Sequence, residues 1–103
     1  SLHEDIYFSL DYFEKALYGY FSEKKSIISK NDLVNLPNSI KVITYELALR
    51  FLTDYLKGNV YFHINYENHN LDRADAQLRL LESINYQWDQ IIEINNSLVS
   101  SMF

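Results

Sequence analysis

The amino-acid sequence predicts an all-α fold in which three to four helices form one small helical unit over residues 1–103. Helix breakers are scarce, since the chain has only two glycines and one proline, and a chain with so few of them favours long helices. Apolar residues recur at steps of three and four along most of the sequence, which is the spacing of one helix face. Hydrophobic residues make up 48% and charged residues 22%, as in ordinary globular domains.

The first predicted helix runs from about Asp5 to about Glu23. Its apolar stripe has the helical steps of three and four, with Ile6, Leu10, Phe13, Leu17 and Tyr20. Other aromatic rings of this segment lie off the stripe, so more than one side of the helix should be covered. Aromatic residues form 16% of the chain. A domain of this size has little interior in which to bury them, so a partner surface is expected.

A short second helix is predicted from a capping box. The Ser29 hydroxyl can accept a hydrogen bond from a first-turn amide while Asp32 reaches back. Pro37 should end this helix, because a proline ring disfavours helical geometry at the residue before it. Pro37 can itself occupy the first turn of the next helix.

The remaining segments are a central helix, a loop and a long closing helix. The central helix is predicted over about Asn38–Lys57 and is apolar on nearly all sides, which is typical of a buried helix. Gly58 should supply the left-handed residue that ends it. Residues 59–68 are expected to form an ordered loop. The closing helix is predicted to run unbroken from about Asn70 to about Ser100, with Asn70 as its N-cap.

Several kinds of catalytic or metal centre are excluded by the motifs that are missing. The two glycines, Gly19 and Gly58, lie far apart and form no phosphate-binding loop. His3, His63 and His69 lack the spacing of helical metal ligands, and with no cysteine there is neither a thiolate site nor a cysteine nucleophile. The sequence therefore predicts no catalytic residues, no metal site and no bound cofactor of its own.

Charge and hydropathy limit the expected partners and location. The net charge is −5 and the nine Lys and Arg residues are scattered, so no nucleic-acid surface is expected. No apolar run approaches the roughly 20 residues of a membrane span, and no membrane association is expected. No signal peptide is visible at the start, and a cysteine-free chain fits a reducing compartment, so the predicted location is cytoplasmic. The first residue is not Met, as expected if the chain begins inside a longer protein.

A few polar and aromatic residues are candidate ligand contacts, each with a structural alternative. Arg50 can form an intrahelical ion pair with Glu46, or it can point into a cleft and bind an oxygen-rich ligand through its forked donors. Asp54, one turn further on, can orient Arg50 or accept from a ligand hydroxyl. Tyr61 can stack on a ligand or cap the core. Trp88 can contact a ligand, although large rings are more often packed in the core.

Two segments resemble a known superfamily. Residues 43–62, with the string Arg-Phe-Leu-Thr-Asp-Tyr-Leu at 50–56, and residues 70–78 look like the C-terminal part of phosphotransferases of the aminoglycoside phosphotransferase and choline kinase superfamily. The nearest branch is the bacterial N-acetylhexosamine 1-kinases, which phosphorylate the anomeric hydroxyl of a free amino sugar. The Tyr18-Gly19-Tyr20 element also fits that branch. One departure is Asn59, which stands where the family commonly has Asp.

The resemblance implies an acceptor-binding helical subdomain of a protein-kinase-like phosphotransferase. The catalytic His-x-Asp-x-x-x-x-Asn loop and the metal-binding Asp of such enzymes do not occur in this sequence, so ATP and magnesium would bind to a missing N-terminal part of the same chain. By resemblance, Arg50, Tyr61 and Trp88 contact the amino-sugar substrate. Some relatives carry a mucin-desulfating sulfatase label. The chain lacks the chemistry for that activity, since its single proline, Pro37, has neither Cys nor Ser two residues before it.

A second hypothesis belongs to a different functional class. The chain would then be a stand-alone helical interaction domain, and its aromatic excess would form a partner-binding or self-association face. A homodimer is one expected form. A His-x-Asp-x-x-x-x-Asn motif encoded upstream would favour the kinase.

Overall fold

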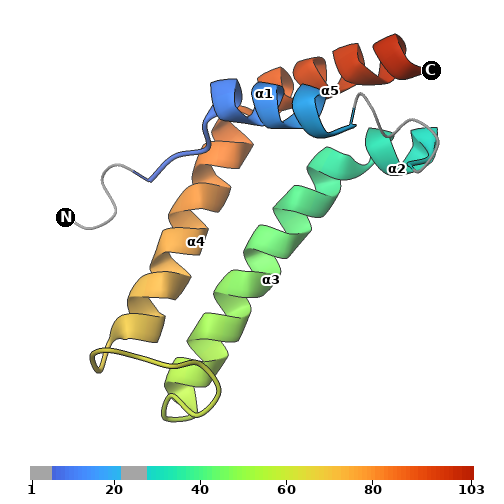
Figure 1. The fold of residues 1–103 in the computed structure, drawn as a ribbon. Coiled ribbons are helices and arrows are strands. Elements are labelled where there is room, and N and C mark those ends of the chain that lie inside the picture. The colour runs from blue at the N-terminus through green and yellow to red at the C-terminus, as the bar shows by residue number, and fades with distance from the viewer. Residues whose placement is uncertain (1–5, 22–27) are drawn as a thin grey trace.

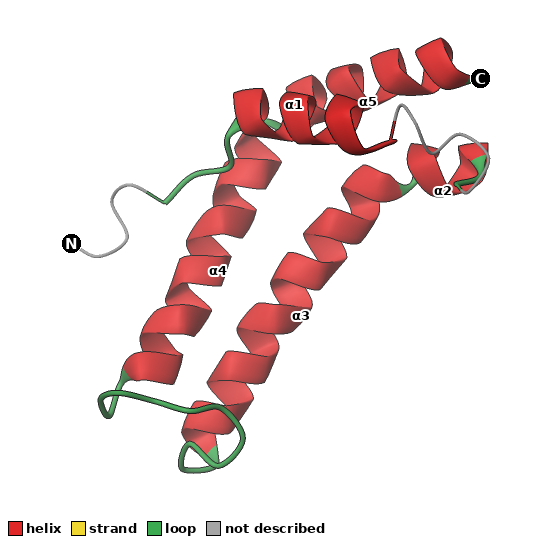
Figure 2. Ribbon diagram, viewed as in Figure 1, coloured by secondary structure: helices red, strands yellow, loops and turns green. Residues whose placement is uncertain are grey.

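The computed structural model describes residues 6–21 and 28–103 and confirms the all-α fold class (Figure 2). Five helices occur in these residues, one more than the upper limit predicted from the sequence. They are α1 Leu10–Phe21, α2 Lys30–Val34, α3 Leu36–Leu56, α4 His69–Tyr86 and α5 Trp88–Met102. No strand occurs in the described part of the chain, and residues 59–68 form the expected loop up to the start of α4.

The helices form two parts, an arm and a head. Figure 1 shows α3 and α4 side by side as an antiparallel hairpin, the arm, with α1, α2 and α5 gathered across one end of it as the head. The buried apolar cluster lies in the head, and its members come from α1, α2, α4 and α5: Phe13, Leu17, Leu33, Ile84, Ile91, Leu98, Val99 and Met102. The arm is a single layer of two helices, so it cannot bury both of its faces.

The arm helices approach each other through small residues. Ala48 on α3 and Ala74 on α4 are each 3% exposed. Thr44 is also buried, and its hydroxyl donates to the Ile40 carbonyl at 2.8 Å, which satisfies the hydroxyl within its own helix.

The prediction of one unbroken closing helix is wrong. The chain turns at Gln87, whose φ of −102° and ψ of 17° depart from helical values, so α4 ends at Tyr86 and α5 starts at Trp88. The turn lets α5 cross the end of the arm and bury Ile91 and Leu98 in the head. This position has no glycine or proline that would have predicted a turn. A contact between distant segments stabilises the turn instead. The Gln87 side-chain amide donates to the Phe8 carbonyl at 2.6 Å.

The first helix also starts later than predicted. Residues 6–9 are not helical, and α1 begins at Leu10, where the Ser9 hydroxyl accepts from the Tyr12 N–H at 3.1 Å as an N-cap contact. The segment before the helix is bound to α4 instead, since the Phe8 N–H donates to Ser83 Oγ at 2.8 Å. The other predicted end, near Glu23, lies outside the described residues, as do Asp5 and His3.

The local signals around α2 and α3 are confirmed in part, since α2 ends before Pro37 but Leu36, which Pro37 was expected to keep out of helical geometry, is the first residue of α3. Ser29 Oγ accepts from the Asp32 N–H at 3.0 Å, and Pro37 lies in the first turn of α3. At the other end of α3, Gly58 has a φ of 90°. Its N–H donates to the Tyr55 carbonyl at 3.2 Å, and the Asn59 N–H donates to the Asp54 carbonyl at 2.8 Å. These two bonds are those of a Schellman motif, which turns the chain into the loop.

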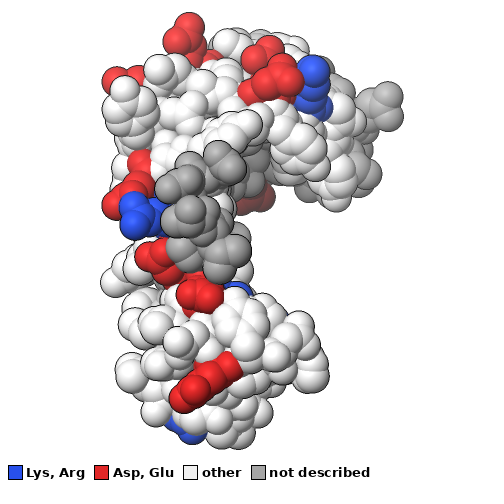
Figure 3. Space-filling model, turned by 90° about the vertical axis from the view of Figure 1, so that its left-hand side faces the viewer, with Lys and Arg blue, Asp and Glu red and all other residues white. Residues whose placement is uncertain are grey.

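None of the helices in residues 6–21 and 28–103 combines the length and the apolar character that a membrane crossing requires. Figure 3 shows acidic side chains spread over one face of the molecule, with basic side chains at a few separate places.

Candidate functional site

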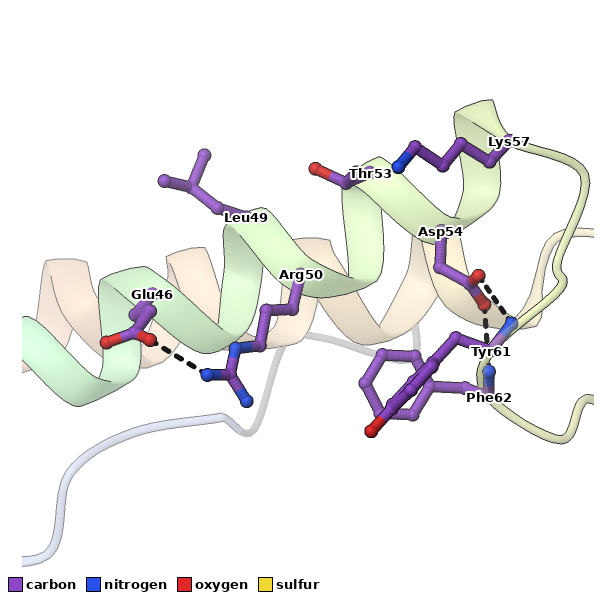
Figure 4. Close-up of a pocket in the computed structure, with 8 residues that line it drawn as sticks. All are labelled: Glu46, Leu49, Arg50, Thr53, Asp54, Lys57, Tyr61 and Phe62. Carbon is purple, nitrogen blue, oxygen red and sulfur yellow. Dashed lines mark hydrogen bonds and ion pairs between the residues drawn. The ribbon is translucent and has the colours of Figure 1, made fainter.

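The free end of the arm carries an open pocket of about 560 Å³. The last three turns of α3 and the loop that follows supply its lining, which Figure 4 shows: Glu46, Leu49, Arg50, Thr53, Asp54, Lys57, Tyr61 and Phe62. Two of the three predicted contact residues, Arg50 and Tyr61, therefore line one pocket. They meet because the Schellman turn folds the loop back along α3.

Asp54 fixes the position of this loop. Its side chain is only 4% exposed. Its Oδ1 accepts from the Tyr61 N–H at 2.7 Å and its Oδ2 accepts from the Phe62 N–H at 3.0 Å. Both carboxylate oxygens are thus bound to loop backbone. The prediction that Asp54 orients Arg50 is corrected by this geometry, because its carboxylate turns into the loop and positions the backbone of Tyr61.

The hydrogen bonds determine the charge state of Asp54. Burial by itself raises the pKa of this carboxyl, but the N–H groups of Phe62, Tyr61 and Val60 and the amide of Asn70 stabilise the anion and outweigh burial. The net effect holds the pKa of Asp54 below its ordinary value of 3.8. Asp54 is therefore ionised at neutral pH and serves as a structural anion.

Asn70 and Arg73 of α4 close the free end of the arm. Asn70 is fully buried, and its Nδ2 donates to Asp54 Oδ2 at 2.8 Å and to Asn59 Oδ1 at 3.2 Å. Its Oδ1 accepts from an Arg73 guanidinium N–H at 2.9 Å. Arg73 also donates to the His63 carbonyl at 2.9 Å. All the hydrogen-bonding groups of the Asn70 amide are engaged, so the two helices and the loop form one connected polar network.

Arg50 forms the intrahelical pair that the sequence allowed and also lines the pocket. Its guanidinium donates to Glu46 at 3.0 Å, and the two side chains are 65% and 55% exposed. An exposed i, i+4 pair contributes only about 0.3–0.5 kcal/mol, so a ligand carboxylate or hydroxyl can compete for the guanidinium. A second hollow of about 220 Å³, lined by Ile43, Glu46, Leu47 and Arg50, lies against the same pair. Arg50 thus borders two hollows while paired with Glu46.

The loop has two aromatic residues with different surroundings. Phe62 covers the arm, whereas Tyr61 stays exposed. The Phe62 ring packs on the Phe51 ring at a centroid distance of 4.8 Å and covers the arm. The Tyr61 ring stays 83% exposed and touches Phe62 edge-on at 4.9 Å. Figure 4 shows Arg50 and Tyr61 on the same side of α3, with the Tyr61 hydroxyl pointing back along the helix. The exposed Tyr61 face is free to stack on a ligand.

Trp88, the third predicted contact residue, is not part of this pocket. It opens α5 and packs against the buried cluster of the head, and the Lys41 ammonium lies 4.0 Å from its ring centroid. Lys41 precedes Arg50 by nine residues, which places the two about 14 Å apart along the helix axis. The fold therefore places Trp88 near the opposite end of α3 from Tyr61.

Arg79, His63 and His69 lie outside the pocket lining. Arg79 lies 3.9 Å from Asp75, with side chains 53% and 44% exposed, so the two form a solvated i, i+4 pair. His63 is exposed in the loop. His69 begins α4, stacks on Tyr66 at 4.6 Å and accepts from the Asn65 N–H at 3.1 Å.

Magnesium, which the resemblance implies for a longer protein, finds no ligand cluster among the described residues. Residues 6–21 and 28–103 bring together no group of three or more His, Asp or Glu side chains that could hold a metal ion. Asp54 is the most buried carboxylate at the pocket, and its oxygens already accept from the loop and from Asn70. We therefore derive no phosphoryl-transfer step from these residues. The pocket offers instead donors, one exposed ring and a small apolar wall.

Asn70 and Asn59 are the pocket-supporting residues that the sequence patterns missed. The only available signal was an Asp in the last turn of a helix that is followed by Gly58 and Asn59, a local pattern that also fits an ordinary helix end. Asn70 was interpreted as an N-cap, yet its side chain makes no capping bond and turns into the network instead. The sequence matches no known protein-family model.

Proposed function

We propose that this chain is the acceptor-binding helical subdomain of a kinase that transfers the ATP γ-phosphate to a free N-acetylhexosamine. The observation that carries the proposal is that Arg50 and Tyr61, the two residues that the resemblance assigns to the sugar, line one open pocket. An exposed tyrosine face beside a forked donor suits a sugar, which presents both an apolar ring face and hydroxyl oxygens.

The support for the loop adds to this proposal. Because Asp54 binds the Tyr61 and Phe62 amides, the Tyr61 backbone is held in place before any ligand arrives. Such preorganisation lowers the entropic cost of binding. In this proposal Arg50 exchanges its exposed partner Glu46 for sugar hydroxyl or acetamido oxygens, and Tyr61 packs on the ring. Trp88, which packs in the head, has a structural role.

In this proposal the catalytic residues and the ATP and magnesium sites lie outside the described residues. The partner in this proposal is the missing N-terminal part, which supplies the catalytic base and binds ATP and magnesium. The chain by itself is proposed not to turn over ATP. The proposed place of action is the cytoplasm, where the reaction finds ATP.

The proposal is tested by titrating free N-acetylglucosamine and N-acetylgalactosamine into the ¹⁵N-labelled chain and following its NMR spectrum. We expect millimolar binding with the largest shifts at residues 50, 53, 61 and 62, and at least a tenfold loss of affinity in Arg50→Ala and in Tyr61→Ala. Arg79→Ala and Tyr86→Ala are matched controls, since Arg79 also has an exposed i, i+4 partner and Tyr86 is 91% exposed.

Unchanged binding in Arg50→Ala and Tyr61→Ala would refute the assignment, as would shifts centred on the controls. Turnover of ATP by the chain alone would also contradict it, because the described residues are proposed to lack the catalytic part.

The second candidate function is a helical interaction domain. It is favoured by the exposed apolar side chains of α3, among them Val42, Leu52 and Leu56 at 60%, 36% and 75% exposed. Binding of a sugar in the pocket and binding of a partner on these side chains are compatible with each other.

A further inference from the structure

The outer side of α3 carries a row of apolar residues that the fold leaves partly uncovered. We name this row the α3 seam, and it consists of Val42, Tyr45, Leu49, Leu52 and Leu56, which are 60%, 50%, 45%, 36% and 75% exposed. Successive members are three, four, three and four residues apart. This is the a and d spacing of two heptads, with which helices pack side by side.

The seam is distinct from the sugar pocket. Leu49 is the only seam residue that also lines the pocket. The other four members lie about 80° to 160° around the helix axis from Arg50, because a helix advances 100° per residue. A contact along the seam therefore covers Leu49 at the edge of the pocket and includes neither Arg50 nor Tyr61.

The distribution of charge among the helices favours α3 as the contact surface between two negatively charged copies of the chain. Lys41 and Arg50 balance Glu46 and Asp54 on α3, so this helix has no net charge. In contrast α1, α4 and α5 each carry more Asp and Glu than Lys and Arg. Two copies of a chain with a net charge of −5 meet the least repulsion when they approach through α3.

We propose that the α3 seam is a homodimer interface, in which the seam of one chain packs on the seam of a second copy around a twofold axis. Such an isologous contact needs one self-complementary surface, and an uncharged a/d row provides it. The two α3 helices then pack side by side along their seams, so the uncovered side of each α3 gains a partner.

The exposed area indicates a weak dimer. With about 150 Å² for a fully exposed large side chain, the seam offers roughly 400 Å² of apolar surface per copy. Flanking residues add to this, yet the total stays at or below the roughly 800 Å² per partner of a standard interface. We expect a dissociation constant of about 10–100 µM, as for other contacts at the lower end of interface size.

Analytical ultracentrifugation of the chain from about 5 to about 500 µM spans this range. We expect a reversible monomer–dimer equilibrium. The double variant Val42→Ser/Leu56→Ser removes two strongly exposed seam residues and should raise the dissociation constant at least about 30-fold. The matched control is Ile43→Ser/Val60→Ser, whose residues are 62% and 80% exposed and lie off the seam. It should associate like the unmodified chain.

Salt separates an apolar contact from an ionic one. Raising NaCl from about 0.05 M to about 0.5 M should leave the dimer as tight or tighter, because it screens the repulsion between two negative chains. Far-UV circular dichroism checks that the variants keep their helices, and Leu56→Ser alone replaces the double variant if helix content falls. A monomer at every concentration would overturn the proposal. So would equal weakening by the seam and control variants, or dissociation of the dimer by salt.

Discussion

Replacement of Asn70 by Asp would place a second buried carboxylate against Asp54. The two side chains have the same shape, so the change converts the Nδ2–H donor, 2.8 Å from Asp54 Oδ2, into an oxygen that repels it. Asn70 is fully buried, so the new carboxylate has little access to water. Only Arg73, 2.9 Å from the other amide atom of Asn70, remains as a favourable partner.

The size of the effect follows from these contacts. Loss of a hydrogen bond to a charged group costs about 1.5–3 kcal/mol, and the buried like charge adds to it, so Asn70→Asp should lose about 3 kcal/mol or more at pH 8. For a chain of about 100 residues this corresponds to a decrease in Tm of at least roughly 12 °C. Urea unfolding, followed by circular dichroism, measures the change directly.

The pH dependence separates this cause from simple loss of packing. A carboxyl whose pKa is raised in the folded state binds a proton more readily there, so its destabilising effect is complete at high pH and disappears as the pH falls. The deficit of Asn70→Asp at pH 5 should therefore be well below its deficit at pH 8. Asn70→Ala is the control, since it loses the donor without adding a charge and its deficit of about 1–3 kcal/mol should stay constant over this range. Equal deficits of Asn70→Asp at the two pH values would falsify the electrostatic account of the network.

Three further perturbations test other parts of the fold. The pKa of Asp54 is lowered in the folded protein, so its contribution to stability is complete above the unfolded value near 3.8 and is lost as the pH falls through the lower folded value. Asp54→Asn should therefore be less stable than the unmodified chain at pH 7. The difference in unfolding free energy should narrow in urea titrations at decreasing acidic pH. Gln87→Ala removes the 2.6 Å bond to the Phe8 carbonyl and should cost about 1 kcal/mol, with faster amide exchange near Phe8 and unchanged exchange in the arm. Leu98→Ala empties a fully buried site in the head and should cost about 2–5 kcal/mol in the same urea assay, whereas a loss below 1 kcal/mol would place the core elsewhere.

The local elements were predictable because their signals lie within a few residues of each other. The capping contact of Ser29, the first-turn position of Pro37 and the left-handed Gly58 depend on backbone geometry that those residue types determine themselves. The candidate pocket was predictable only in part. Arg50 and Tyr61 were selected by residue type and by resemblance, yet their position on one pocket depends on the Schellman turn and on Asp54.

Asp54 shows why the rest of the site was not predictable. One turn beyond Arg50 on the same helix, it reads from the sequence as a second ligand contact. Its actual partners are backbone amides of the loop and an amide of α4, which sequence patterns do not bring near it. The same reason applies to Gln87, which turns the closing helix because Phe8, 79 residues away along the chain, accepts its hydrogen bond.

The sequence alone therefore determined the fold class, the ends of α2 and the central helix and the loop position, since few breakers, helical periodicity and capping residues act locally. Only the tertiary structure decided that the closing helix turns at Gln87, that Asp54 is a buried anchor, and that the apolar side of α3 remains uncovered. Each of these depends on contacts between segments that are distant in the sequence. In the arm, a few polar contacts position the loop against the two helices, and one side of α3 remains uncovered because the arm has a single layer.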